Sequence, residues 1–205
     1  MQLTALEQVE LLRNVRFALI IAPEDMAYEV ELVGRSIKLD QAIYQPLVEA
    51  LADQPRSLRE LMGHPDLRKL DFSTILQAIK ILISTYHVTP ALSEAEAERR
   101  KQATRGLNEA ILKRARFGAD TQTLASPITA SGIDVSRSEQ LFLLAHLRKV
   151  DPVPFIWSIL QVQGEKLIKD GQVLASPEAN QAELKVQAQQ FKASRLPLFQ
   201  KLGLV

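Results

Sequence analysis

The sequence predicts a mainly α-helical protein with a small β component. In several segments apolar residues recur every three or four positions, and glycine or proline separates these segments. Candidate strands are few and short. With 205 residues, of which 46% are hydrophobic and 24% charged, the chain is long enough to bury a sizeable core.

Residues 1–22 are expected to form an N-terminal helix and a connecting strand. Apolar side chains within residues 3–16 follow a helical rhythm (Leu6, Val9, Leu12 and Val15). Residues 17–21 form a short apolar run that Pro23 ends, which suggests a buried strand. Residues 26–33 fit a helix or a strand equally well.

Residues 23–92 are expected to form a winged-helix-like unit. Residues 35–39 alternate polar and apolar side chains, which predicts a strand, and residues 86–90 can form a returning strand. Between them, three helices are predicted to begin after Asp40, Ser57 and Asp71, each a favourable N-cap residue. A strand, three helices and a strand in this order are typical of a winged helix, a variant of the helix-turn-helix.

Residues 93–205 are expected to form a helical C-terminal region. Ser93 caps a long polar helix that reaches residue 117, and residues 119–132 read as a loop with one charge. Later helices are expected to start at Ser136, Asp151 and Ser176, and the last should end near residue 195, before Leu196 and Pro197.

No motif for catalysis, cofactor binding or metal binding is present. The eight glycines are too scattered for a Rossmann dinucleotide or S-adenosylmethionine fingerprint or a P-loop. His64, His87 and His146 lack the spacing of metal ligands, and solvated or hydrogen-bonded imidazoles are the preferred interpretation. The chain has no cysteine, which excludes thiol catalysis and disulfides. We therefore predict no catalytic, cofactor-binding or metal-binding residues.

Charge gives little support to nucleic-acid binding. The net charge is +1, whereas phosphate recognition favours a strong basic excess. A basic cluster at Arg99, Arg100 and Lys101 lies on a helix that also carries many glutamates, which favours a solvated surface. The third helix of the winged-helix-like unit offers base edges only Gln77 and Lys80. We expect weak, sequence-indifferent DNA binding at most, and a DNA-binding regulator remains the alternative.

The first residues lack the basic start and apolar core of a signal peptide. The most apolar stretch, residues 17–23, is too short to span a bilayer. A cytoplasmic protein without membrane contact is the expectation.

Three stretches carry a family resemblance. Residues 7–17 (EQVELLRNVRF), 124–133 (LASPITASGI) and the end of the chain from Phe191 to Gly203 resemble segments of a bacterial methyltransferase family. That family has an S-adenosylmethionine-dependent catalytic domain, a predicted regulatory domain and a C-terminal winged-helix-containing part. Some members resemble protein-lysine methyltransferases that act on outer-membrane proteins. The resemblance covers most of this chain, but none of its motifs is catalytic.

The resemblance implies an accessory, non-catalytic role. The expected partner is a methyltransferase catalytic domain or its protein substrate, and no cofactor is expected in this chain. The candidate contact residues are Thr129 and Ser131, in the uncharged part of that loop (residues 121–132), and Trp157, off the main apolar stripe of its helix. Equally open alternatives are that the loop is a linker packed between helices and that Trp157 is buried by the C-terminal helices.

Overall fold

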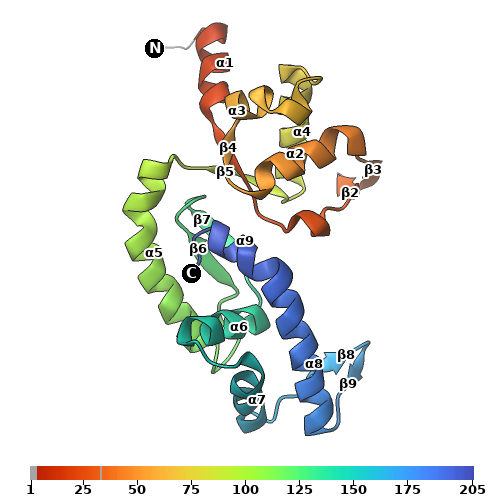
Figure 1. Cartoon of the computed structure of the whole chain (residues 1–205), viewed down its shortest axis with the longest axis vertical. Coiled ribbons are helices and arrows are strands. Elements are labelled where there is room, and N and C mark those ends of the chain that lie inside the picture. Colours follow the sequence, from red (N-terminus) through yellow and green to blue (C-terminus); the bar gives the residue numbers. More distant parts are fainter. Residues whose placement is uncertain (1–3, 33) are drawn as a thin grey trace. The chain divides into compact units, whose positions relative to one another are not determined.

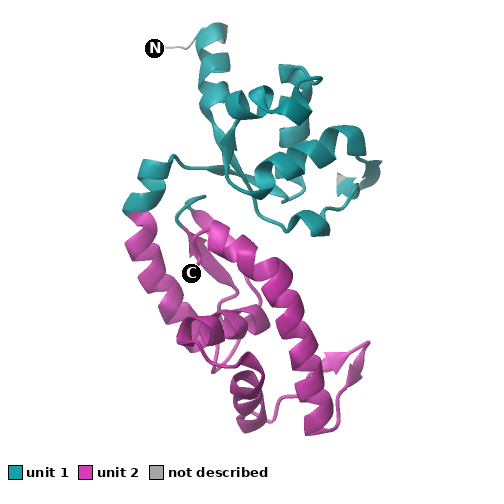
Figure 2. Cartoon of the chain, in the orientation of Figure 1, with its two compact units in different colours: residues 1–99, 127–130 teal, residues 100–126, 131–205 magenta. Residues whose placement is uncertain are grey.

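The computed structural model describes residues 4–32 and 34–205, and its fold is mainly α with small antiparallel sheets, as predicted. Leu3 and Val33, which end two of the expected segments, lie outside the described residues. The chain divides into two compact units, shown in Figure 2: unit 1 comprises residues 1–99 and 127–130, and unit 2 comprises residues 100–126 and 131–205.

Unit 1 is built on a three-stranded antiparallel sheet in the order β4-β1-β5. The central strand β1 (Arg16–Leu19) pairs with β4 (Arg56–Ser57) on one side and with β5 (Val88–Ala91) on the other. Phe17, Ala18 and Leu19 are buried. A short, continuously apolar run is what a central, well-covered strand requires.

The predicted strand at residues 35–39 forms, but it is not part of the β4-β1-β5 sheet. It is β3 (Arg35–Lys38), which pairs with β2 (Glu29–Leu32) in a separate hairpin and not with β5. Gly34 adopts φ +72° between the two strands, a conformation that favours glycine. All four β3 residues are exposed, so this strand lacks the apolar content that the central position of the sheet demands.

Four helices complete unit 1: α1 (Ala5–Asn14), α2 (Gln41–Ala52), α3 (Leu58–Gly63) and α4 (Phe72–Ser84), with single 3-10 turns at Pro23–Asp25 and Pro65–Leu67. The predicted N-caps are confirmed. Asp40 accepts a hydrogen bond from the Ala42 amide at 2.9 Å, and Asp71 accepts one from the Thr74 amide at 2.8 Å. Ser57 forms a capping box with Glu60, in which the Ser57 amide donates to the Glu60 carboxylate. This hydrogen bond lowers the pKa of Glu60.

Helix α4 is apolar on most of its surface because it packs within the core of unit 1. Ile75, Ala78, Ile79 and Leu82 are buried in one cluster with residues of β1 and α2. Its other large apolar side chains are partly buried against the same cluster. The exposed stripe of α4 is polar and consists of Ser73, Gln77, Lys80 and Ser84.

Unit 2 is a set of helices with two small hairpins (Figure 1). Helix α5 (Glu94–Arg114) starts in unit 1 and continues into unit 2. After it come β6 (Thr123–Ser126), β7 (Ser131–Asp134), α6 (Arg137–Arg148), α7 (Pro152–Val162), β8 (Ile168–Lys169), β9 (Gln172–Val173), α8 (Pro177–Gln190), a π-helical turn (Phe191–Arg195) and α9 (Leu196–Lys201). Helix α7 packs against α6 and α8.

The predicted loop at residues 119–132 is wrong, because most of it is the β6–β7 hairpin. Thr123 pairs with Asp134 and Ser126 with Ser131. Leu124 and Ile133 are buried, and Ser126 is buried with its hydroxyl donating to the Leu202 carbonyl at 2.7 Å. Small, uncharged residues therefore mark a packed hairpin here and not a mobile connection.

The predicted end of the last helix near residue 195 is also wrong. Figure 1 shows α8 and α9 on one continuous helical path, which the π-helical turn joins. The Leu196 amide donates to the Phe191 carbonyl, five residues back, as in a π-helix. Pro197, which lacks an N–H, directly follows this turn, at the second position of α9.

Buried amide side chains hold unit 2 together. Asn108 is 1% exposed, donates to the carbonyls of Ala125 and Leu204 at 2.9 and 3.0 Å, and accepts from the Ala125 amide at 2.8 Å. Asn180 is fully buried, accepts from the Leu167 amide at 2.8 Å and donates to the carbonyls of Leu174 and Ser176 at 2.9 and 2.8 Å. Asn108 thus satisfies backbone groups of segments distant in sequence, and Asn180 satisfies those of the segment that leads into α8.

Arg137, in the first turn of α6, joins three segments in the same way. Its Nε donates to the Ala115 carbonyl at 2.8 Å, beyond the end of α5. Its two terminal nitrogens donate to the side chains of Glu165 and Gln163, which follow α7. The Arg137 side chain is 16% exposed, whereas that of Glu165 is 43% exposed.

Candidate functional site

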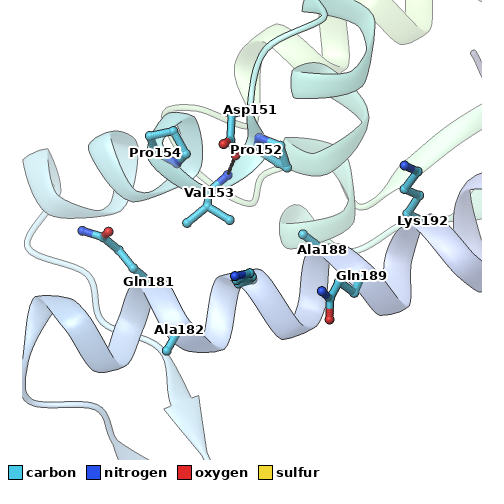
Figure 3. A pocket seen from close by; sticks show the side chains of 10 residues that line it. Asp151, Pro152, Val153, Pro154, Gln181, Ala182, Ala188, Gln189 and Lys192 are labelled. Atoms are coloured by element: carbon cyan, nitrogen blue, oxygen red, sulfur yellow. Dashed lines mark hydrogen bonds between the residues drawn. The ribbon is translucent and has the colours of Figure 1, made fainter.

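Unit 2 has a groove between the start of α7 and the long helix α8, which we call the α7–α8 groove (Figure 3). It consists of two adjoining cavities of about 540 and 480 Å³ that share Pro152, Ala188 and Lys192. The lining residues come from α6 and the reversal after it, the start of α7, α8, the π-helical turn and the start of α9: Phe142, His146, Lys149, Val150, Asp151, Pro152, Val153, Pro154, Gln181, Ala182, Lys185, Ala188, Gln189, Phe191, Lys192 and Leu196.

A tight reversal between α6 and α7 places one wall of the groove. Lys149 ends α6 in the left-handed conformation (φ +56°), and the Val150 amide donates to the Ala145 carbonyl at 3.1 Å. Asp151 then caps α7 by accepting from the Val153 amide at 2.9 Å, and Pro152 occupies the first helical position. The predicted helix start is confirmed, and it sets the start of α7 opposite α8, as Figure 3 shows.

The other wall depends on the π-helical turn. Phe191 stacks on Phe142 with ring centroids 5.2 Å apart and lies 6.1 Å from the ring of Phe199. Arg195 closes the turn, with its guanidinium 4.7 Å from the Phe199 ring and its Nε 2.6 Å from the Glu139 carboxylate. These contacts hold the turn in place, so that Phe191, Lys192 and Leu196 line the groove.

The rim of the groove is basic. The side chains of Lys149, Lys185 and Lys192 are exposed, and within residues 4–32 and 34–205 none of the three forms an ion pair with a carboxylate. Asp151 is the acidic residue among the lining side chains, and its carboxylate is engaged at the start of α7. The groove therefore combines an apolar floor with unpaired positive charge.

The residues predicted as contacts do not meet at this groove. Trp157 lies on α7 but is half-buried and does not line either cavity. Thr129, in the turn between β6 and β7, is 9% exposed, and Ser131 begins β7 with an exposed side chain. Helix α7, which carries Trp157, packs against α6 and α8.

Sequence reasoning missed the lining lysines. Lys185 and Lys192 are seven residues apart, which places them on one face across two helical turns. That spacing was visible in the sequence, but the same spacing of lysines is found on an ordinary solvent-exposed helix face. Lys149 and Val150 gave no local signal, because their place at the groove follows from the reversal after α6.

His87 is a hydrogen-bonded core histidine, and two cations of α5 pair with a glutamate on the same helix. His87 is buried, its Nδ1 lies 2.6 Å from the Thr85 hydroxyl, and burial lowers its pKa. On α5, Glu109 pairs with Arg105 at 3.5 Å and with Lys113 at 3.7 Å, the solvated arrangement expected from the four-residue spacing.

In the part of the chain that the structure describes, no group of three or more histidine or carboxylate side chains is placed to hold a metal ion. Likewise, no helix formed by the described residues has the length and apolar character to cross a membrane.

No protein-family model matches the chain, and no solved structure matches it. The chain is 33% identical over 198 residues to the uncharacterized protein sll1526 of Synechocystis sp.. The alignment covers 97% of this chain but 39% of that relative, so the chain corresponds to well under half of the protein that it resembles.

Proposed function

We propose that this chain is a non-catalytic accessory region of an S-adenosylmethionine-dependent methyltransferase, with protein lysine as one class of acceptor. It would act through contacts with the catalytic domain or with the protein substrate. The observation that carries the proposal is the α7–α8 groove, which offers apolar surface and positive charge and has no serine, threonine, cysteine or glycine in its lining.

The length of the relative supports this proposal. Because the match covers 39% of sll1526, most of that protein lies outside the region similar to this chain. A catalytic domain could occupy the remainder, as the family resemblance of residues 7–17 and 124–133 implies. The chain would then share the compartment of the methyltransferase, which we propose to be the cytoplasm.

The test separates cofactor binding from partner binding. The part of sll1526 outside the match is produced as a separate chain, and each chain is titrated with S-adenosylmethionine by calorimetry. We expect saturable binding to the relative's part, none to this chain, and co-elution of the two chains in size-exclusion chromatography. Micromolar cofactor binding by this chain alone would contradict a non-catalytic role, and a lack of co-elution would contradict the partnership.

The alternative is a winged-helix DNA-binding regulator, and the sheet of unit 1 is the observation that favours it. Helices α2, α3 and α4 lie next to the β4-β1-β5 sheet, an arrangement compatible with a winged helix. Against it, the exposed stripe of α4 carries one cation, Lys80, where a reader helix needs several donors. Fluorescence anisotropy with duplex DNA at physiological salt decides between them, since a regulator would bind a specific site in the nanomolar range.

A further inference from the structure

We infer that the α7–α8 groove binds an acidic, amphipathic helical segment of a partner protein. This inference rests on the proposed function in that the partner is a protein, and it adds the chemistry of the segment and the residues that receive it.

Charge is the first argument. Lys185 and Lys192 both line the groove and lie seven residues apart on one helical path, which is about 10 Å along the axis. Lys149 contributes a third cation from the opposite wall, at the end of α6. Carboxylates at a matching seven-residue spacing on the bound segment would meet these ammonium groups, whose charges no described carboxylate neutralises.

Apolar surface is the second argument. Between the cations lie Val150, which is 43% exposed, and the partly buried Pro152, Ala188 and Leu196. Exposed apolar surface that is rimmed by polar groups marks an interaction site. An apolar stripe on the bound segment would cover this surface while its charged flanks face the lysines.

The groove walls decide the conformation of the segment. Both walls are helices, whose backbone groups already bond within α7 and α8, so the groove has no strand edge that could pair with an extended peptide. The segment must then satisfy its own backbone hydrogen bonds, which an α-helix does. The lining of α8 and its π-helical turn runs from Gln181 to Leu196, about 22 Å, which matches about four turns of a bound helix.

A nucleic acid fits this site less well. Binding of single strands relies on aromatic faces that are open to stack with bases. The two phenylalanines of the lining, Phe142 and Phe191, are 5% and 7% exposed and stack on each other. The lysines alone would attract phosphates, but the apolar floor would stay uncovered.

The experiment uses the full chain and a fluorescein-labelled helical peptide of about 15 residues. The peptide has leucines at a three- and four-residue spacing and glutamates at the flanking positions, and a second peptide carries glutamine in place of every glutamate. Anisotropy measures binding to the wild type, to Lys185→Glu and to Lys192→Glu. Lys166→Glu is the matched control, because Lys166 is an exposed lysine of unit 2 that does not line the groove.

We expect the acidic peptide to bind at least about fivefold more weakly to each groove variant than to the control, since each reversal turns one attraction into a repulsion. The glutamine peptide should bind more weakly than the acidic one and should not distinguish the variants. If a variant shows reduced helicity by circular dichroism, Lys185→Gln or Lys192→Gln replaces it, with the same order of affinities expected.

Equal affinity of the two peptides, or equal loss in Lys185→Glu and Lys166→Glu, would overturn the inference. A thymidine oligonucleotide of about 15 nucleotides that displaces the peptide and binds more tightly would replace it with a nucleic-acid site. If no acidic peptide binds while the chain still co-elutes with the remainder of sll1526, the groove assignment fails and the accessory role stands.

Discussion

The fully buried Asn180 gives the sharpest test of how unit 2 is stabilised. Replacing it with alanine removes one accepted and two donated hydrogen bonds, with the Leu167 amide and the carbonyls of Leu174 and Ser176. At about 1 kcal/mol of net stabilisation for each bond, Asn180→Ala should lower the free energy of unfolding by about 3 kcal/mol. Alanine has a higher helix propensity than asparagine, which offsets well under 1 kcal/mol of this loss of stability.

Asn180→Asp makes the prediction specific to hydrogen bonding. An ionised carboxylate keeps the bond from the Leu167 amide but faces two carbonyl oxygens that it cannot donate to, and it carries a buried charge. The pKa of the new carboxyl in the folded state should therefore rise above its unfolded value of about 3.9. Compared with Asn180→Ala, the Asn180→Asp variant should therefore lose the most unfolding free energy near pH 7, and this difference should shrink as the pH falls towards 4.

The assay is urea unfolding followed by the fluorescence of Trp157, the single tryptophan of the chain, which lies on α7 against α8. Gln181→Ala is the control, because the neighbouring Gln181 is exposed. Unfolding free energies of Asn180→Ala and Gln181→Ala within about 0.5 kcal/mol of each other would refute the reasoning. So would an aspartate variant more stable than the alanine variant at pH 7.

Three further changes test other parts of the structure. Arg137→Lys should destabilise unit 2 by about 2 kcal/mol in the same urea assay, because an ammonium cannot reach the three acceptors that the guanidinium bridges; a neutral result would contradict the bridging role. Gly132→Ala should destabilise the β6–β7 hairpin, because a Cβ there would lie 2.4 Å from Cγ2 of Thr123; adding Thr123→Ser removes that methyl and should restore the melting temperature, and no rescue would refute the clash. Burial lowers the pKa of His87, so stability present above about pH 6.5 should decline as the pH falls below it; His87→Gln should flatten that part of the profile followed by circular dichroism, and an unchanged slope would argue against it.

Local sequence signals predicted the helix starts well. Asp40, Ser57, Asp71, Ser136 and Asp151 all cap the helices expected of them, because a cap needs only residues within one turn. Strand pairing was harder to predict, because the partners of β1 lie far along the chain and alternate polarity alone favoured residues 35–39. Residues 119–132, which carry one charge, were taken for a loop because a hairpin with small side chains has no strong periodicity.

The groove could not be predicted from the sequence, because it arises where three separate segments meet. Its geometry depends on the reversal at Lys149 and on the π-helical turn at Phe191–Arg195. An i to i+5 turn has no sequence signature at the level of helical rhythm, and Pro197 suggests an end to the helix and not a continuation. Lys185 and Lys192 could be placed on one face, but not opposite α7.

The central position of β1 has a consequence for how unit 1 folds. Arg16 pairs with Ser57 and Ala91, whereas the strands of the β2–β3 hairpin meet their partners within a few residues. Contacts of such large sequence separation slow folding, because the chain between them must first be ordered. During synthesis the apolar strand Phe17–Leu19 would leave the ribosome well before β5 does. Until then its backbone would stay unpaired along the edge that β5 later covers, and chaperones or other nascent chains could bind there.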